Sequence, residues 1–335
     1  MATEKPPSKP PKPPILEISS EGLDQLSEEE RKLFLLLVPA HKRSAISLSQ
    51  FEGLYDKDMI AQDTAYVEKM EDRFRREEKP ETAYFKRRAE LLEAIARNEI
   101  KHDNWLGPEA KPITASRYDD IKNGVDMIVE LFKKDNPAEV ASLLGLSVDV
   151  TSNVTSLEDK LAKIKDNILN GQMAYVKYFM SSTGARQEMP RVSKVVIGTE
   201  AGSIRELSLL RLEIHELGRA IRANKDKGEL SPESVLSLES RFREARLKLA
   251  KHRVQILFLN EIELQLKTFL DFADKNNQPQ LILEYQKALD KIREIRQEKS
   301  TPADKKSFNL SPDETDNNDN DGVYRALKTG LKIFE

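Results

Sequence analysis

The chain has no cysteine and only four histidines among its 335 residues. Disulfides, cysteine nucleophiles, zinc fingers and iron–sulfur clusters are therefore excluded, and a histidine-rich metal site has too few ligands. No apolar run approaches the roughly 18 residues that a membrane-spanning helix needs, and the N-terminus has no apolar signal core. We therefore expect a cytoplasmic protein with no membrane partner.

The chain also has no large excess of positive or negative charge. The 54 Lys and Arg residues and the 57 Asp and Glu residues nearly cancel, which leaves a net charge of −3. Binding of nucleic acid through bulk positive charge is excluded, whereas binding through a local basic patch stays open. The 33% of charged residues against 39% of apolar ones is typical of long, solvated helices, and the length allows two or three domains.

The two ends of the chain differ in composition from the rest. Residues 1–19 begin with MATEKPPSKPPKPP, and we expect a disordered, extended arm there because proline fixes φ and lacks an N–H. Residues 300–335 are acidic and rich in Asn and Asp, which predicts a disordered tail with a short helix over 323–335. The NNDNDG run in this tail is not a calcium loop, because Lys328 stands where a bidentate glutamate is required.

Residues 20–80 are predicted to form an N-terminal helical region. Ser27 and Glu30 have the spacing of a capping box, so a helix begins there, and we expect it to stop near Pro39. A second helix is predicted over 48–78, where a proline again ends the pattern.

Residues 81–202 are predicted to form a compact core with a small mixed sheet. Apolar residues at helical spacing predict a helix over 81–100. A capping Ser156 begins another helix, which should end at Gly171. Alternating or continuous apolar runs predict strands at 125–131, 140–150, 174–180 and 191–198. The order of elements indicates the fold class α+β/α: an α/β core flanked by the N-terminal helical region and a C-terminal helical arm.

Residues 203–299 carry apolar residues at steps of three and four, the seam of a coiled coil. We predict an antiparallel helical hairpin arm whose middle helix has about 42 residues, or about 63 Å at 1.5 Å per residue. Its two halves should pair with the shorter helices before and after it. The basic run RFREARLKLAKHR at 241–253 could follow phosphates, but the charged outer face of a bundle is the ordinary interpretation.

Two carboxylates stand at matching places in the predicted core. Asp126 lies in the strand of YDDIKNGVDMIVE, and Asp149 ends the next apolar run, in SVDVTS. If the two strands are hairpin neighbours, both carboxylates converge at one end of the sheet, where they repel unless a cation joins them. Mg²⁺ prefers one or two carboxylates with water and phosphate oxygens. It can activate water and neutralise charge on a scissile phosphate.

This pattern resembles the PD-(D/E)xK nuclease superfamily, and its segments are similar to those of uncharacterised bacterial proteins of small-genome candidate phyla. The resemblance covers residues 81–202. It implies a helix with an acidic residue, a strand with an Asp, a second strand with Asp/Glu-x-Lys, a further helix and more strands. It thereby implies a nuclease-like core, Mg²⁺ as cofactor and nucleic acid as partner. Asp126 and Asp149 would bind the metal, and Glu93 or Glu99 would be the helix acid.

The chain departs from the family pattern at the lysine. The position two residues after Asp149 is Thr151, so a catalytic cation must come from elsewhere. Lys160, on the helix after the second strand, is the first choice, and Lys177, in the strand YVKYF, is the second. A lysine there would orient the attacking water or stabilise developing negative charge.

Two interpretations of function remain open. The first is a Mg²⁺-dependent phosphodiesterase acting on DNA or RNA through the residues named above. The second is a non-catalytic interaction or scaffold protein that forms a homodimer through residues 203–299, with an inactive nuclease-like core or an unrelated α/β core. The IGTEAGS turn at 197–203 could present a helix start to an anion, although most such turns are only turns.

Overall fold

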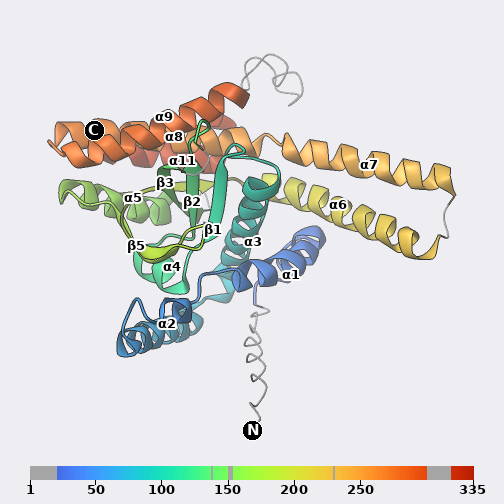
Figure 1. The fold of residues 1–335 in the computed structure, drawn as a ribbon, viewed down its shortest axis with the longest axis horizontal. Helices are drawn as coiled ribbons and strands as arrows, with labels where there is room; N and C mark the ends of the chain where they lie inside the picture. The colour runs from blue at the N-terminus through green and yellow to red at the C-terminus, as the bar shows by residue number, and fades with distance from the viewer. Residues whose placement is uncertain (1–20, 137–138, 150–153, 229–230, 300–317) are drawn as a thin grey trace, which may run out of the picture.

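The computed structural model describes residues 21–136, 139–149, 154–228, 231–299 and 318–335. The predicted proline-rich arm and residues 300–317 of the predicted tail lie outside the described residues. Helices surround one sheet, as expected of a mixed α/β protein. Figure 1 shows a body with one helical hairpin projecting from it.

Among the described residues, four helical segments precede the sheet. They are α1 (Glu28–Arg43), η1 (Leu48–Phe51), α2 (Lys57–Glu77) and α3 (Pro80–His102). The predicted capping box is confirmed, since Ser27 Oγ accepts from the Glu30 N–H and the Glu30 carboxylate accepts from the Ser27 N–H. The predicted stop near Pro39 is wrong, because α1 continues to Arg43. The carbonyl that proline leaves without a donor belongs to Leu35, which is exposed, so solvent can reach it.

Five strands form one mixed sheet. They are β1 (Ala110–Thr114), β2 (Met127–Phe132), β3 (Val140–Asp149), β4 (Ala174–Met180) and β5 (Arg186–Gly198), in the order β1-β2-β3-β5-β4. β3 and β5 are parallel, and the other neighbours are antiparallel. The helix α4 (Arg117–Asn123) lies between β1 and β2 in the chain, and α5 (Val154–Leu169) follows β3. The predicted mixed α/β class is therefore confirmed.

The four predicted strands are present, and β1 is the strand that sequence periodicity missed. Its five residues, AKPIT, include Pro112 and follow a run of helix-breaking residues. Proline is tolerated there because β1 is at the edge of the sheet. A strand this short and interrupted gives no periodic apolar signal.

The predicted single middle helix of the arm is wrong. The helix is interrupted at residues 251–253, between α7 (Pro232–Ala250) and α8 (Val254–Lys275). The reason is burial. Only Ala245 and Leu249 of α7 are buried, whereas fourteen residues of α8 are, so α8 lies against the sheet and α7 does not.

The predicted pairing of these helices is confirmed. α7 packs against α6 (Ala201–Lys227), and α8 packs against α9 (Pro279–Lys299). α8 also contacts β5 and α9 contacts β3, so the second pair covers the sheet, whereas α6 and α7 form the projecting hairpin (Figure 1). The predicted terminal helix is confirmed as α11 (Gly322–Gly330), with η2 (Asn318–Asn320) before it and η3 (Leu331–Phe334) after it.

Apolar side chains fill both faces of the sheet. The larger cluster joins β2, β3 and β5 to the surrounding helices α3, α5, α8 and α9. A smaller cluster on the opposite face includes Val125, Ile128, Val176 and Val192. Within the described ranges, no helix is both long and apolar enough to cross a membrane.

Candidate functional site

The two predicted metal-binding residues lie at one end of two neighbouring strands, although Asp126 is just outside its strand and not within it as predicted. Asp126 directly precedes β2, and its N–H donates to the carbonyl of Leu146 in β3 at 3.0 Å. The antiparallel register of β2 and β3 ends at the pair Met127 and Leu146, so Asp126 lies at the end of this ladder. Asp149 ends β3, and the two residues therefore lie at the same end of the β2–β3 pair.

The side chain of Asp149 lies outside the described residues. The distance between the Asp126 and Asp149 carboxylates, and a metal ion shared by them, therefore stay predictions. In the part of the chain that the structure describes, no group of three or more His, Cys, Asp or Glu side chains could hold a metal ion. The predicted site has only two carboxylates, with water and phosphate as the other ligands. It therefore would not count as a group of three or more such side chains.

A lysine not predicted as a site residue lies on the face of position 149. Lys194 of β5 pairs with Gly145 in the parallel register of β3, and positions 145 and 149 of a strand point to the same face. Its ammonium group donates to the backbone carbonyl of Asn123 at 2.9 Å. The lysine side chain therefore crosses β3 at a place where the central strand has a glycine.

The charge environment of Lys194 joins it to the predicted site. Burial lowers the pKa of Lys194 to about 8; the negative charge of Asp126 opposes this shift, and the positive charges of Lys160 and Lys163 add to it. Lys160, the first choice from the sequence, therefore lies within electrostatic range of Lys194. The charges of Asp126, Lys160 and Lys163 therefore all act on Lys194.

Lys177, the second choice, is engaged between α2 and β4. Its ammonium group forms an ion pair with Asp63 of α2 at 2.6 Å. Three tyrosine rings surround it, with centroids at 5.3, 5.4 and 5.5 Å: those of Tyr55, Tyr118 and Tyr178. The ion pair and the cation–π contacts stabilise the packing of α2 on β4. Lys177 is therefore part of this packing, and Lys160 and Lys194 are the better candidates for the site.

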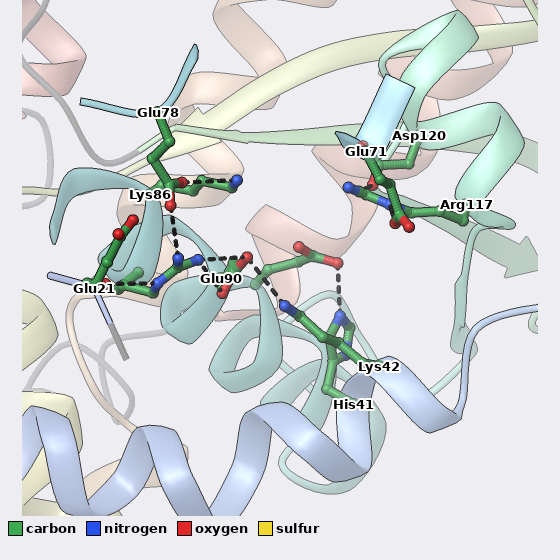
Figure 2. A network of polar contacts seen from close by, with 11 residues as sticks. Glu21, His41, Lys42, Glu71, Glu78, Lys86, Glu90, Arg117 and Asp120 are labelled. Carbon is green, nitrogen blue, oxygen red and sulfur yellow. Dashed lines mark hydrogen bonds and ion pairs between the residues drawn. The ribbon is translucent and has the colours of Figure 1, made fainter. Parts of the chain in front are cut away.

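Glu93, the predicted helix acid, contacts a histidine of α1. His41 Nε2 and Glu93 Oε1 lie 2.6 Å apart, and Figure 2 shows His41 among the polar contacts near α3 and α4. Burial raises the pKa of Glu93 well above its usual range, with contributions from Asp120 and Glu90. Burial also lowers the pKa of His41 to about 4. Burial thus favours the neutral forms of both side chains, and a role for Glu93 at the metal site stays a prediction.

Glu99, the alternative helix acid, lies at the base of the projecting hairpin. It is fully buried, and its carboxylate lies 3.4 Å from Arg211 of α6. Burial raises the pKa of Glu99 well above its usual range. Asp103, at the end of α3, binds Arg246 of α7 at 2.8 Å. These contacts attach α6 and α7 to α3, which gives Glu99 a structural role.

The network labelled in Figure 2 borders a hollow of about 450 Å³ between α2, α3 and α4. Two of its lining cations are paired: Lys86 with Glu78 at 2.9 Å and Arg117 with Glu71 at 2.7 Å. The apolar part of the lining consists of Phe74, Ala83 and Ile121. Because these cations are neutralised, the hollow is a poor site for an anion.

Asp119, in the first turn of α4, is fully buried, and its carboxylate is saturated with donors. Oδ1 accepts from the Lys177 N–H at 2.8 Å and Oδ2 from the Tyr178 N–H at 3.0 Å, and two further side chains donate to it. The carboxylate thus accepts hydrogen bonds from backbone N–H groups of β4, as a neighbouring strand would at this edge of the sheet. It fixes α4 to the sheet, and with it the Asn123 carbonyl that holds Lys194.

The helix start in IGTEAGS is occupied by a carboxylate of the chain itself. Asp321 Oδ2 accepts from Thr199 Oγ1 at 2.9 Å and from the Glu200 N–H at 3.1 Å. The start of α6 is therefore closed to an external anion in this structure.

The basic run at 241–253 is largely neutralised. Five of its cations have acidic partners: Arg241, Arg243, Arg246, Lys248 and Arg253. This pairing favours the interpretation as a charged outer face of the hairpin over a track for phosphates.

Comparisons with models of protein families, with curated proteins and with solved structures found no significant match to this chain. They identify no superfamily, so the resemblance to the PD-(D/E)xK nucleases stays an interpretation. Any function must therefore be inferred from the geometry of the site.

Proposed function

We propose that the chain is a Mg²⁺-dependent phosphodiesterase that acts on DNA or RNA, with its site at the end of the β2–β3 pair, beside β5. The observation that supports this best is that positions 149 and 194 share one face of the sheet, with the negative charge of Asp126 acting on Lys194. The order of α3, β2, β3 and α5 also agrees with the order that the nuclease resemblance implies.

In this proposal, Asp126 and Asp149 hold the metal ion. Their donor set fits Mg²⁺, which takes one or two carboxylates and fills its other positions with water and phosphate oxygens. A bound Mg²⁺ would lower the pKa of a water molecule and offset negative charge on the scissile phosphate. The ladder between β2 and β3 would keep the two carboxylates in place, because both strands belong to the rigid sheet.

The lysines would act on the phosphate rather than on the ion. Lys194 gives one N–H to the Asn123 carbonyl, and its remaining N–H groups can donate to a phosphate oxygen. With its pKa at about 8, most of the group is charged at neutral pH and can stabilise developing negative charge. Lys160 would assist from α5. Lys194 would supply the cation that the family pattern places at Thr151.

Cleavage assays on the full chain, with single- and double-stranded DNA and RNA, test the proposal. We expect cleavage that requires Mg²⁺, stops on chelation and falls about 100-fold in Asp126→Asn. Asp159→Asn, on the exposed side of α5, is the matched control and should keep the parent activity. Lys160→Met and Lys194→Met should reduce cleavage while Mg²⁺ binding is kept. No Mg²⁺-dependent cleavage of any substrate, or full activity in Asp126→Asn, would contradict the proposal.

The projecting hairpin favours a second candidate function, a surface for homodimer formation. Leu236 and Leu247 of α7 are 61% and 54% exposed, and only two side chains of α7 are buried. A second copy of the hairpin would cover apolar surface that two helices alone leave open. Sedimentation velocity should then show a concentration-dependent dimer that Leu247→Asp abolishes. A monomer at every concentration would contradict this candidate.

A further inference from the structure

The C-terminal helix is attached to the body by one apolar face. The buried side of the segment consists of Val323, Ala326, Leu327, Gly330, Leu331 and Phe334. The opposite side is exposed and carries Arg325, Lys328 and Thr329. A helix of nine residues is too short to be stable alone in water, so α11 depends on the surface that it covers.

The α8 side of this surface is aromatic. Phe334 lies against Phe269 and Phe272, with ring centroids 5.0 and 5.3 Å away. The ammonium group of Lys165, from α5, lies 5.5 Å from the centroid of the Phe272 ring. Phe334 therefore packs between two aromatic rings of α8, one of which also has a cation–π contact with Lys165.

The α5 side of the surface fits the backbone of the segment closely. Gly330 lies so near α5 that a Cβ there would be 2.7 Å from Leu161 Cδ1. Lys165 donates to the carbonyl of Ile333, which lies beyond the end of α11. The close approach at Gly330 and the hydrogen bond to Ile333 fix the segment against α5.

Asp321 adds a polar contact that sets the position of α11 along the surface. Its Oδ1 accepts from the N–H groups of Val323 and Tyr324 at 2.8 and 3.1 Å and thereby caps α11. Its Oδ2 accepts from Thr199 Oγ1 and from the Glu200 N–H, at the start of α6. One buried carboxylate therefore satisfies the starts of two helices.

We propose that residues 318–335 are a detachable docking segment, and that the surface formed by α5, α8 and the start of α6 is its binding site. The contacts described above come from one helix face and one carboxylate of the segment. Contacts of this kind are those of an amphipathic helix in a groove. A separate peptide of the same sequence therefore binds this surface when the α11 of the chain is displaced.

Docking of α11 also affects the proposed active site. α11 and η3 contact α5 and α8, and α5 carries Lys160 and Lys163. Release of the segment would leave α5 less firmly held, so these lysines would lose their position near Lys194 and cleavage would fall. This consequence rests on the proposed phosphodiesterase function, whereas the docking itself does not.

The test uses the full chain with Leu327→Asp, which puts a charge into the apolar face and displaces the segment. Thr329→Asp adds the same charge on the exposed face and is the matched control. The probe is a dye-labelled peptide of residues 318–335, followed by fluorescence anisotropy. We expect saturable binding to the Leu327→Asp chain and binding at least about tenfold weaker to the parent and to Thr329→Asp, whose own segment fills the site.

The same peptide carrying Asp321→Ala should bind the Leu327→Asp chain at least about tenfold more weakly than the unmodified peptide. Circular dichroism establishes that the Leu327→Asp chain is folded. If this folded chain does not bind the unmodified peptide, or binds both peptides equally, the proposal is overturned.

Hydrogen exchange on the unmodified chain gives a second test that needs no variant. We expect the amides of α11 to exchange together and faster than those of α8, because the segment detaches without unfolding the core. Equal protection of α11 and α8 would overturn the proposal. Neither measurement depends on cleavage, so a failure of the phosphodiesterase proposal would be seen separately.

Discussion

The ammonium group of Lys194 donates to the backbone carbonyl of Asn123 at 2.9 Å. This contact spans the central strand β3, since Lys194 belongs to β5 and Asn123 ends α4, just before β2. It holds a partly buried cation on the sheet face that position 149 shares. It also requires the glycine at position 124, where φ is +61° and a Cβ would lie 2.8 Å from Lys194 Nζ.

Gly124→Ala is expected to lower the free energy of unfolding by about 1–3 kcal/mol, because it combines a positive φ with a close contact. Gly202→Ala is the matched control, since a Cβ there would meet only Glu200 Oε1, at 3.8 Å. Urea denaturation of the two variants measures the difference. Equal stability of both would contradict the close packing of Lys194 against position 124.

Lys194 should also make stability depend on pH above 8. Its pKa is about 8 in the folded chain and 10.5 as the ordinary value. The folded state therefore favours the neutral amine, and stability falls as the pH decreases from 10.5 to 8. Lys194→Met removes this titration. As the pH rises from 8 to about 10, urea denaturation should show that the parent gains stability relative to Lys194→Met. A stability difference that does not change with pH would argue against the lowered pKa.

Asp119→Ala is expected to lower the free energy of unfolding by about 3–5 kcal/mol, because two backbone N–H groups of β4, one buried and one partly buried, lose their acceptor. Asp120→Ala removes a neighbouring carboxylate whose side chain is 33% exposed, and it should cost about 1 kcal/mol or less. Thermal denaturation of the two variants compares these losses. Similar values would show that Asp119 does not serve as the edge partner of β4.

The free energy of unfolding of Glu93→Gln should increase relative to that of the parent as the pH rises above 4.5. Burial raises the pKa of Glu93 well above this ordinary value of 4.5, so the folded chain keeps the carboxyl protonated while the unfolded chain ionises it. Stability of the parent is then lost with rising pH. Glutamine can donate a similar hydrogen bond to His41 and does not titrate. Denaturation at acidic and neutral pH tests this, and a difference that stays constant with pH would refute it.

Periodicity in the sequence located Asp126 and Asp149, because polar residues stand out in apolar strands. Lys194 stands out in the same way in RVSKVVIG, and a search for cations at strand positions would have found it. The spacing of the family motif instead points to Lys160 and Lys177. The hydrogen bond to Asn123 spans 71 residues, and no local pattern reports a contact of that separation.

Elements fixed by tertiary contacts were the ones that the sequence did not predict. Residues 251–253 continue a helical pattern, but the helix is interrupted there, between the mostly exposed α7 and the buried α8. Asp119 and Asp321 appear in the sequence as ordinary acidic residues near a helix start. Their roles come from β4 and from the start of α6, which are distant along the chain.

Calorimetric titration of Mg²⁺ into the full chain tests the central claim most directly. If positions 126 and 149 form a metal site at one end of the β2–β3 pair, the parent should show one saturable binding event. That event should be lost in Asp126→Asn and in Asp149→Asn and kept in Asp159→Asn, whose side chain lies on the exposed side of α5. A parent chain that binds no Mg²⁺, or binding that survives both strand substitutions, would contradict the claim.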